Sequence, residues 1–234
     1  MRVLHISATP RIEASNTYPI AEAFIGSLQS TVESVEVDTI DVFNHDLPSI
    51  AGENIENKYN LMQGQPPEGD AAIAWQEIES LVTHFVAADL YVVTTPMWNF
   101  SIPYALKYYI DAIVQPGYTF TYTDQGQPVG LVLGKKMVCI TSRGGDYSPG
   151  TPFHPYDFQE PYLRTIFGFI GITDIEFINA QPMSITAELR DQAIASATES
   201  ARSLAAHTRW VDDDADAATG EPGPKDLKPK PLTG

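Results

Sequence analysis

Hydroxyl groups gather ahead of the first helical pattern of the chain, and they are of a type that can bind phosphate. Thr9 follows the apolar run at 3–6, and Ser15-Asn16-Thr17 stands where the helical pattern begins. The first turn of a helix presents unpaired backbone N–H groups and a partial positive charge, so it attracts anions. Ser15 or Asn16 could equally serve only as the helix cap. The segment lacks G-x-G-x-x-G, which argues against a dinucleotide site of the Rossmann type.

A second segment, Met97-Trp98-Asn99-Phe100, follows the apolar run at 90–95. Its aromatic rings and thioether offer apolar contact to one face of a planar heteroaromatic ring. The Asn99 amide adds both a hydrogen-bond donor and an acceptor. The alternative is a core turn that leads into the helix expected to begin at Pro103, since proline is tolerated at the first helical position.

The third segment, Ser142-Arg143-Gly144-Gly145, follows the apolar run at 136–141. Two adjacent glycines let the backbone approach a ligand closely and present N–H groups to it. The Arg143 guanidinium could stabilise developing negative charge. The alternative is a flexible turn with a surface arginine.

Strand and helix patterns alternate around these segments. Strands are expected at 3–6, 35–40 (an edge strand), 90–95, 136–141 and 175–178, and helices at 18–30, 71–87, from 103, 158–169 and 187–209. A β-hairpin is expected at 117–132, and 41–70 is expected to be loop with about one helical turn. The pattern predicts an α/β fold with a doubly wound, five-stranded parallel sheet and an inserted hairpin. Five such strands fit the flavodoxin-like order 2-1-3-4-5.

In that order, ligands bind beyond the carboxyl ends of the strands, near the switch point between the first and third strands. The three polar segments follow strands one, three and four, so we expect them to be neighbours in one crevice. We expect residues 1–210 to form this single domain. Residues 211–234 contain four prolines and three glycines but no aromatic residue, and we expect a disordered, acidic, proline-rich tail.

Composition excludes several classes of protein. The 234 residues are 43% hydrophobic and 19% charged, which suits a packed core, and the net charge of −16 argues against binding to nucleic acid or to an anionic membrane surface. No apolar stretch is long enough to span a membrane, and no secretory signal is evident, so a cytoplasmic location is expected. The single cysteine, Cys139, excludes a disulfide framework, and the histidines do not have the spacing of a metal site.

Four motifs stand at characteristic separations: Thr9 with Ser15-Asn16-Thr17, Met97-Trp98-Asn99-Phe100, Ser142-Arg143-Gly144-Gly145, and Tyr162-Leu163 with Gly168 to Ile172. Together they resemble the FMN-dependent NADH:quinone oxidoreductases, also called FMN-dependent NADH-azoreductases, over roughly residues 2–205. The resemblance implies a flavodoxin-like fold, a homodimer with non-covalent FMN at its interface, and NADH as electron donor. The segment 147–158 departs from the family pattern, which leaves the preferred substrate open.

The resemblance also implies roles for particular residues. Thr9, Ser15, Asn16 and Thr17 would hold the FMN phosphate, Met97, Trp98, Asn99 and Phe100 would contact the isoalloxazine, and Ser142, Arg143, Gly144 and Gly145 would line its pyrimidine side. Arg143 is also the candidate catalytic residue, with an electrostatic role on the reduced flavin or on the acceptor.

Four further residues have several possible places. Tyr118, Phe120 and Tyr122 alternate along the expected hairpin, where they could line the pocket, cover the core or contact a partner subunit, and the interface is favoured. His154 lies in an aromatic, proline-rich stretch and is expected to border the substrate site.

The implied function is two-electron transfer from NADH through FMN to quinones, and to azo compounds as a second class of acceptor, by a ping-pong mechanism. The absence of a convincing Ser/His/Asp or paired-carboxylate pattern fits an enzyme whose cofactor does the chemistry. The alternative is a flavodoxin-type electron carrier with no substrate of its own.

Overall fold

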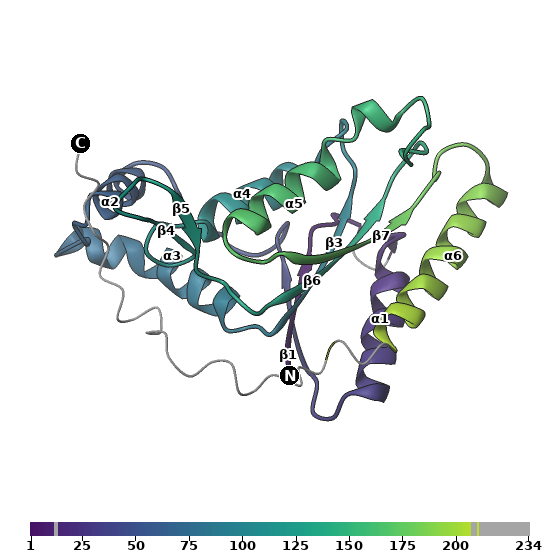
Figure 1. The fold of residues 1–234 in the computed structure, drawn as a ribbon, viewed down its shortest axis with the longest axis horizontal. Helices are drawn as coiled ribbons and strands as arrows, with labels where there is room; N and C mark the ends of the chain where they lie inside the picture. The colour runs from purple at the N-terminus through teal and green to yellow at the C-terminus, as the bar shows by residue number, and fades with distance from the viewer. Residues whose placement is uncertain (12–13, 207–209, 211–234) are drawn as a thin grey trace.

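A five-stranded parallel sheet forms the centre of the molecule (Figure 1). The computed structural model describes residues 1–11, 14–206 and 210. The strands are β1 (Arg2–Ser7), β2 (Glu36–Asp41), β3 (Leu90–Pro96), β6 (Lys136–Ser142) and β7 (Asp174–Ala180), in the order β2-β1-β3-β6-β7. Once the hairpin strands are left out, this is the predicted order 2-1-3-4-5. The predicted fold class is confirmed, with β2 at a sheet edge.

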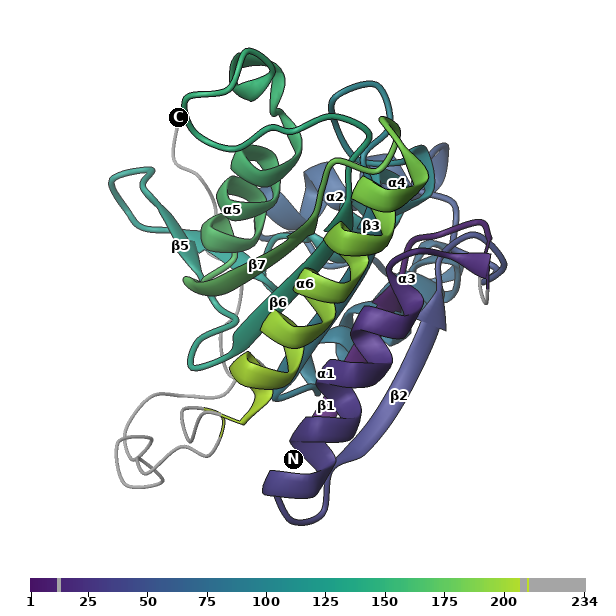
Figure 2. The same cartoon turned by 90° about the vertical axis from the view of Figure 1, so that its right-hand side faces the viewer.

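Helices cover both faces of the sheet (Figures 1 and 2). Helices α1 (Tyr18–Thr31) and α6 (Ala187–Ala205) lie side by side on one face. Helices α2 (Glu53–Met62), α3 (Asp70–Val86), α4 (Tyr104–Ile113) and α5 (Gln159–Phe169) lie on the other. Helix α6 packs closely against α1, because the buried side of α6 carries only small side chains: Ala193, Ala197, Ala201 and Ala205. None of the helices within the described part of the chain combines the length and apolarity needed to cross a membrane.

Side chains of the central strands alternate between two buried cores. Val3 of β1 and Val92 of β3 pack beneath α1 and α6, whereas Leu4 and Val93 pack beneath α3, α4 and α5. Because both faces are covered, these strands are apolar at successive positions instead of alternating with polar residues. That burial explains why the runs at 3–6, 90–95 and 136–141 were recognisable from the amino-acid sequence.

The predicted hairpin is formed by β4 (Phe120–Tyr122) and β5 (Pro128–Gly130), inserted between α4 and β6. Its base packs tightly on the turn after α5: a Cβ added to Gly130 would lie 2.3 Å from the Gly171 nitrogen, and Val132 N donates to Ile170 O at 2.9 Å. The hairpin is therefore fastened to the body of the domain at this end.

One expectation about the helices needs correction. The stretch 41–70 contains a full helix, α2, where about one helical turn was expected. Most residues of α2 are polar, and only Asn57 and Leu61 are buried. The helix is also held by tertiary bonds such as Lys58 Nζ to Val114 O at 3.2 Å. Helix α6 is described over Ala187–Ala205, and the expected helical residues 207–209 lie outside the described residues. The expected tail at 211–234 lies outside the described residues.

Candidate functional site

The three polar segments of the sequence leave one edge of the sheet side by side. Strands β1, β3 and β6 are neighbours, and in their registers Ser7 lies opposite Thr94 and Pro96 lies opposite Ser142. Because the strands are parallel, the loops that follow them begin at the same carboxyl edge, as Figure 1 shows. The predicted convergence of these loops at the switch point is present in the structure.

The first loop buries its hydroxyl groups at the N-terminus of α1. Thr9, Ser15 and Thr17 are buried, and Asn16 is half-buried. Ser15 Oγ lies 2.9 Å from Thr17 Oγ1 and accepts a hydrogen bond from Thr17 N at 3.2 Å. The first bond of the helix runs from Ala21 N to Thr17 O, so the preceding turn keeps N–H groups available for an anion.

The second loop is a tight two-residue turn with both central residues in the left-handed region. Trp98 and Ser101 exchange two backbone hydrogen bonds of 2.9 Å, while Asn99 has φ 48° and Phe100 has φ 71°. Asparagine tolerates this conformation, but phenylalanine rarely adopts it, and such strained residues cost about 1–3 kcal/mol each. The turn leaves the side chains of Trp98, Asn99 and Phe100 exposed beyond the strand end, while Met97 is half-buried.

Trp98 stands on the side of this turn that adjoins a small pocket. Its ring lies 5.8 Å from that of Phe43 and 6.4 Å from that of Tyr104. The pocket has a volume of about 460 Å³ and is lined by Trp98, Asn99, Ser101, Ile102, Tyr104, Lys107 and Tyr162. Burial raises the pKa of Tyr162 to about 12, so its hydroxyl stays protonated and able to donate. Phe43, Tyr104 and Tyr162 were not predicted as site residues, because nothing local distinguishes an aromatic residue beside a site from one in the core.

The third loop leaves little room for side chains at Gly144 and Gly145. A Cβ added to Gly144 would lie 3.1 Å from Ser184 Oγ, and a Cβ added to Gly145 would lie 3.3 Å from the Phe153 ring. Ser142 is half-buried, and its carbonyl accepts from Met97 N at 2.8 Å, which joins the second and third loops. The N–H groups of Gly144 and Gly145 make no hydrogen bond within the described residues, so they are available to a ligand.

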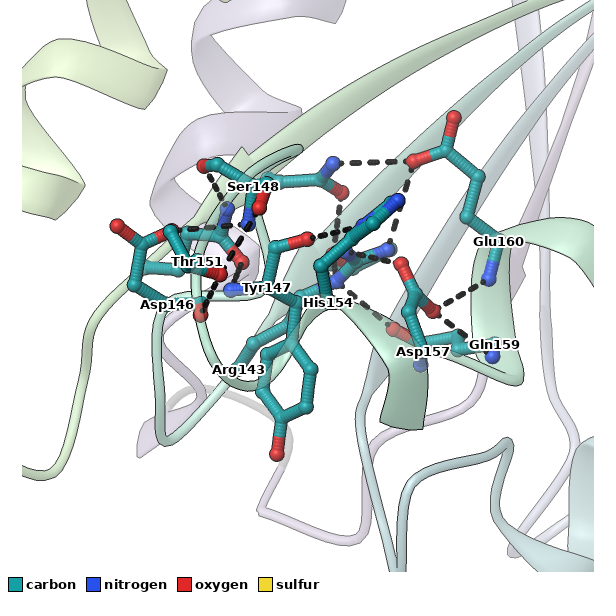
Figure 3. Close-up of polar contacts among 12 residues, drawn as sticks. Arg143, Asp146, Tyr147, Ser148, Thr151, His154, Asp157, Gln159 and Glu160 are labelled. Carbon is teal, nitrogen blue, oxygen red and sulfur yellow. Dashed lines mark hydrogen bonds and ion pairs between the residues drawn. The ribbon is translucent and has the colours of Figure 1, made fainter.

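Arg143 is not where the predicted catalytic role requires it. Its side chain is only 1% exposed and lies inside the protein (Figure 3). Nη1 donates to Asp157 Oδ2 at 2.9 Å, and Nε donates to Thr141 Oγ1 at 3.0 Å and to Gln159 Oε1 at 3.2 Å. Burial lowers the pKa of Arg143, and Asp157 and Glu160 oppose that change. A guanidinium so enclosed does not contact an acceptor in the crevice. We therefore propose a structural role for Arg143 in place of the predicted electrostatic one.

We call Arg143, Thr141, Asp157, Gln159 and Glu160 the Arg143 network. Asp157 Oδ1 accepts hydrogen bonds from the backbone N–H groups of Gln159 and Glu160 at 3.0 and 3.1 Å. These N–H groups, at the start of α5, therefore have a hydrogen-bond acceptor. Gln159 Nε2 donates to Pro96 O at 2.9 Å, at the end of β3. The network therefore ties the second and third loops to α5. Asp157 and Gln159 were missed in the sequence, since neither stands in a recognisable motif.

Of the three hairpin aromatic residues, one is buried in the core and two lie at its edge. Phe120 is buried, with its ring 4.7 Å from that of Phe169, so the favoured interface role is wrong for this residue. Tyr118 and Tyr122 are half-buried against the same core, and the Tyr118 hydroxyl donates to Glu79 Oε1 at 3.1 Å. His154 is exposed on the short helix η2 (His154–Tyr156), and its Nδ1 lies 3.0 Å from Tyr147 O.

Two other features do not belong to this crevice. Burial lowers the pKa of His5 to about 4, and its Nε2 lies 3.0 Å from Thr94 Oγ1, so His5 adds no positive charge near the first loop at neutral pH. A larger pocket of about 980 Å³ lies between β2, the 45–49 segment and α3, and none of its lining residues is a predicted site residue. Within the described ranges, no group of three His, Cys, Asp or Glu residues could hold a metal ion.

The sheet order and the loops at its carboxyl edge define the class of protein. A family described as having a flavodoxin-like fold matches residues 1–205. Over 204 residues the chain is 40% identical to the FMN-dependent NADH:quinone oxidoreductase of Nitratidesulfovibrio vulgaris strain DP4, covering 87% of this chain and 97% of that relative. Over 197 residues it is 42% identical to the protein of the same name from Nostoc punctiforme, covering 84% and 94%. The chain belongs to the flavodoxin-like family of FMN-dependent NADH:quinone oxidoreductases.

Solved structures agree with this placement. The azoreductase of Bacillus anthracis strain Sterne superposes with a TM-score of 0.78 at 28% identity, over 88% of this chain and 99% of that one. An FMN-dependent NADH-azoreductase from B. anthracis strain Ames Ancestor, solved in complex with FMN, superposes with a TM-score of 0.75 at 26% identity, over 87% and 99%.

Proposed function

We propose that this enzyme binds FMN at the crevice of the three loops and transfers two electrons from NADH to quinones, with azo compounds as a second class of acceptor. The observation that carries the proposal is the convergence of the three predicted loops at the carboxyl edge, in a chain 40% identical to a quinone oxidoreductase. Bound FMN would supply the redox chemistry, as flavins do.

The residues at the crevice fit this cofactor. The buried hydroxyls of Thr9, Ser15 and Thr17 beside the first turn of α1 suit a terminal phosphate. The exposed Trp98 and Phe100 side chains suit the planar ring system. The N–H groups of Gly144 and Gly145 suit the carbonyl oxygens of the pyrimidine ring. The phosphate, the ring system and the pyrimidine side of FMN thus each have donors or surfaces of the matching chemistry.

The protein's own contribution is binding and orientation. The strained turn at Asn99 and Phe100 holds its aromatic rings beyond the strand end, and the hydrogen bond from Phe158 N to Phe100 O, 3.0 Å long, supports it. The Arg143 network fixes the spacing of the loops instead of touching reacting atoms. Positioning of this kind is how a protein makes a bound cofactor effective.

Donor and acceptor are expected to use the crevice in turn, because the three loops border a single opening. Initial-rate plots against NADH at several quinone concentrations should be parallel, with one NADH consumed per quinone and two per fully cleaved azo bond. Intersecting lines would require NADH and quinone to be bound together and would contradict the shared crevice.

One mixing experiment separates this function from a flavodoxin-type electron carrier. The yellow holoprotein is mixed with NADH alone under nitrogen, and the flavin absorbance is followed. We expect rapid bleaching, because the enzyme itself accepts the hydride. A carrier would stay yellow until a separate reductase is added.

A homodimer is the proposed assembly. Exposed aromatic side chains are common on α4 and beside the crevice: Tyr104 is 72% exposed, and Tyr108 and Trp98 are also exposed. Tyrosine and tryptophan are enriched at protein interfaces. Light scattering of the FMN-loaded protein should give twice the chain mass, and a monomer mass would contradict the assembly.

A further inference from the structure

An aromatic pair joins the second loop to the segment 147–158, which we call the aromatic loop. The rings of Phe100 and Tyr156 lie 5.5 Å apart, tilted by 34°, and Phe158 N donates to Phe100 O at 3.0 Å. Both rings keep much of their surface in contact with solvent, since Phe100 is 43% exposed and Tyr156 is 51% exposed. The two rings therefore form an uncovered apolar face that begins at the proposed cofactor turn and extends away from it.

The aromatic loop is braced by hydrogen bonds within it and to flanking residues (Figure 3). Ser148 N donates to Asp146 Oδ1 at 2.9 Å, and Thr151 Oγ1 donates to the carbonyls of Asp146 and Ser148 at 2.8 Å each. Gln181, from the segment after β7, accepts from Tyr147 N at 3.2 Å and donates to Ser148 Oγ at 2.9 Å. Tyr156 is thus presented by a stiff support, which lowers the entropic cost of using it to bind a ligand.

The Arg143 network sets where this support stands. Asp157 immediately follows Tyr156, and its carboxylate, 7% exposed, pairs with Arg143 at 2.9 Å. Gln159 ties the same stretch to Pro96 O, three residues before Asn99. The distance between Phe100 and Tyr156 is therefore determined by buried hydrogen bonds at both ends. Arg143 acts here as a positioning residue.

We propose that Phe100 and Tyr156 form a specificity face for extended planar acceptors, which places the second and third fused rings of a polycyclic quinone on Tyr156. The inference rests on the proposed function. Offset stacking on two tilted aromatic rings favours ligands with several conjugated rings over a single ring. A one-ring quinone over the cofactor turn has less surface to place on Tyr156, so its binding depends less on this residue.

The test compares kcat/KM for phenanthrenequinone, which has three rings, with kcat/KM for 1,4-benzoquinone, which has one, in FMN-loaded protein with saturating NADH. Tyr156→Ala should lower the three-ring to one-ring ratio about 10-fold, mainly through KM. Tyr156→Phe, which keeps the ring, should restore the ratio. The matched control is Tyr59→Ala, which removes an exposed tyrosine of α2 outside the crevice and should leave the ratio as in the parent protein.

Further measurements distinguish a failure of the specificity face from a failure of the proposed function. FMN per chain and the mass by light scattering are measured for each variant. An unchanged ratio in Tyr156→Ala, in a parent enzyme that is bleached by NADH and reduces both quinones, overturns the specificity face and leaves the proposed function standing. An equal loss for both quinones, or a loss that follows dissociation of the dimer, also overturns it. A parent enzyme that NADH does not bleach would instead reject the proposed function.

Discussion

Replacing Ser15 with aspartate is expected to yield a folded protein that purifies without flavin. A carboxylate at residue 15 can still accept the Thr17 N–H that Ser15 Oγ accepts now, and acids are favourable at helix N-termini, so the fold should persist. The same charge repels the FMN phosphate. Unit charges about 4 Å apart near a protein surface interact by about 4 kcal/mol, and we expect FMN affinity to fall at least ~100-fold.

Ser15→Asn is the matched control, because asparagine has nearly the shape of aspartate without its charge. We expect it to keep most of its FMN, measured as absorbance per chain and by titration of the apoprotein, with circular dichroism to check the fold. Full FMN occupancy in Ser15→Asp would show that the phosphate lies elsewhere. Equal loss in both variants would show that shape rather than charge is responsible, and it would remove the support for this placement.

Arg143→Met is expected to destabilise the protein by about 3–5 kcal/mol, because removing one partner of a buried ion pair leaves the other charge uncompensated. Asp157 is the stranded group, and Thr141 and Gln159 each lose a donor at the same time. Urea denaturation with FMN at saturation measures the effect. A catalytic arginine would instead be expected to lower turnover more than it lowers stability.

The double variant Arg143→Met with Asp157→Asn tests the cause. If the unpaired Asp157 carboxylate is responsible, neutralising it should recover more than half of the lost stability. Arg143→Lys should lie between the parent protein and Arg143→Met, since lysine keeps the charge but not the planar fork that reaches Thr141, Asp157 and Gln159 together. A stable Arg143→Met variant with slow turnover would instead support a catalytic role for Arg143.

The parts of the fold that could be predicted are those whose signal is local. The strands at 3–6, 90–95 and 136–141 are buried on both faces, so they are continuously apolar. Their alternation with helices predicts a parallel sheet. The polar loops after β1, β3 and β6 could be placed together because parallel strands end at a common edge. Helix α2 could not be predicted, since most of its residues are polar and it buries only Asn57 and Leu61.

The site residues show the same division. Ser15 and Thr17 lie next to a helix start that the sequence marks, and the structure keeps them there, buried and hydrogen-bonded to each other. Phe120 alternates with Tyr118 and Tyr122, and nothing in that spacing says which of the three turns inward. Its burial against Phe169, 49 residues further along the chain, depends on how the hairpin folds onto the end of α5.

The amino-acid sequence by itself determined the class of fold, and it indicated the edge of the sheet and the loops that we propose as the site. These follow from periodicity and from residue types within a few positions of one another. Only the tertiary structure decided the role of Arg143, because its partners Asp157 and Gln159 lie 14 and 16 residues away. An arginine in a glycine-rich loop has the same local pattern whether it faces solvent or is buried. Whether Arg143 is buried depends on its partners Asp157 and Gln159, which lie beside it only in the folded protein.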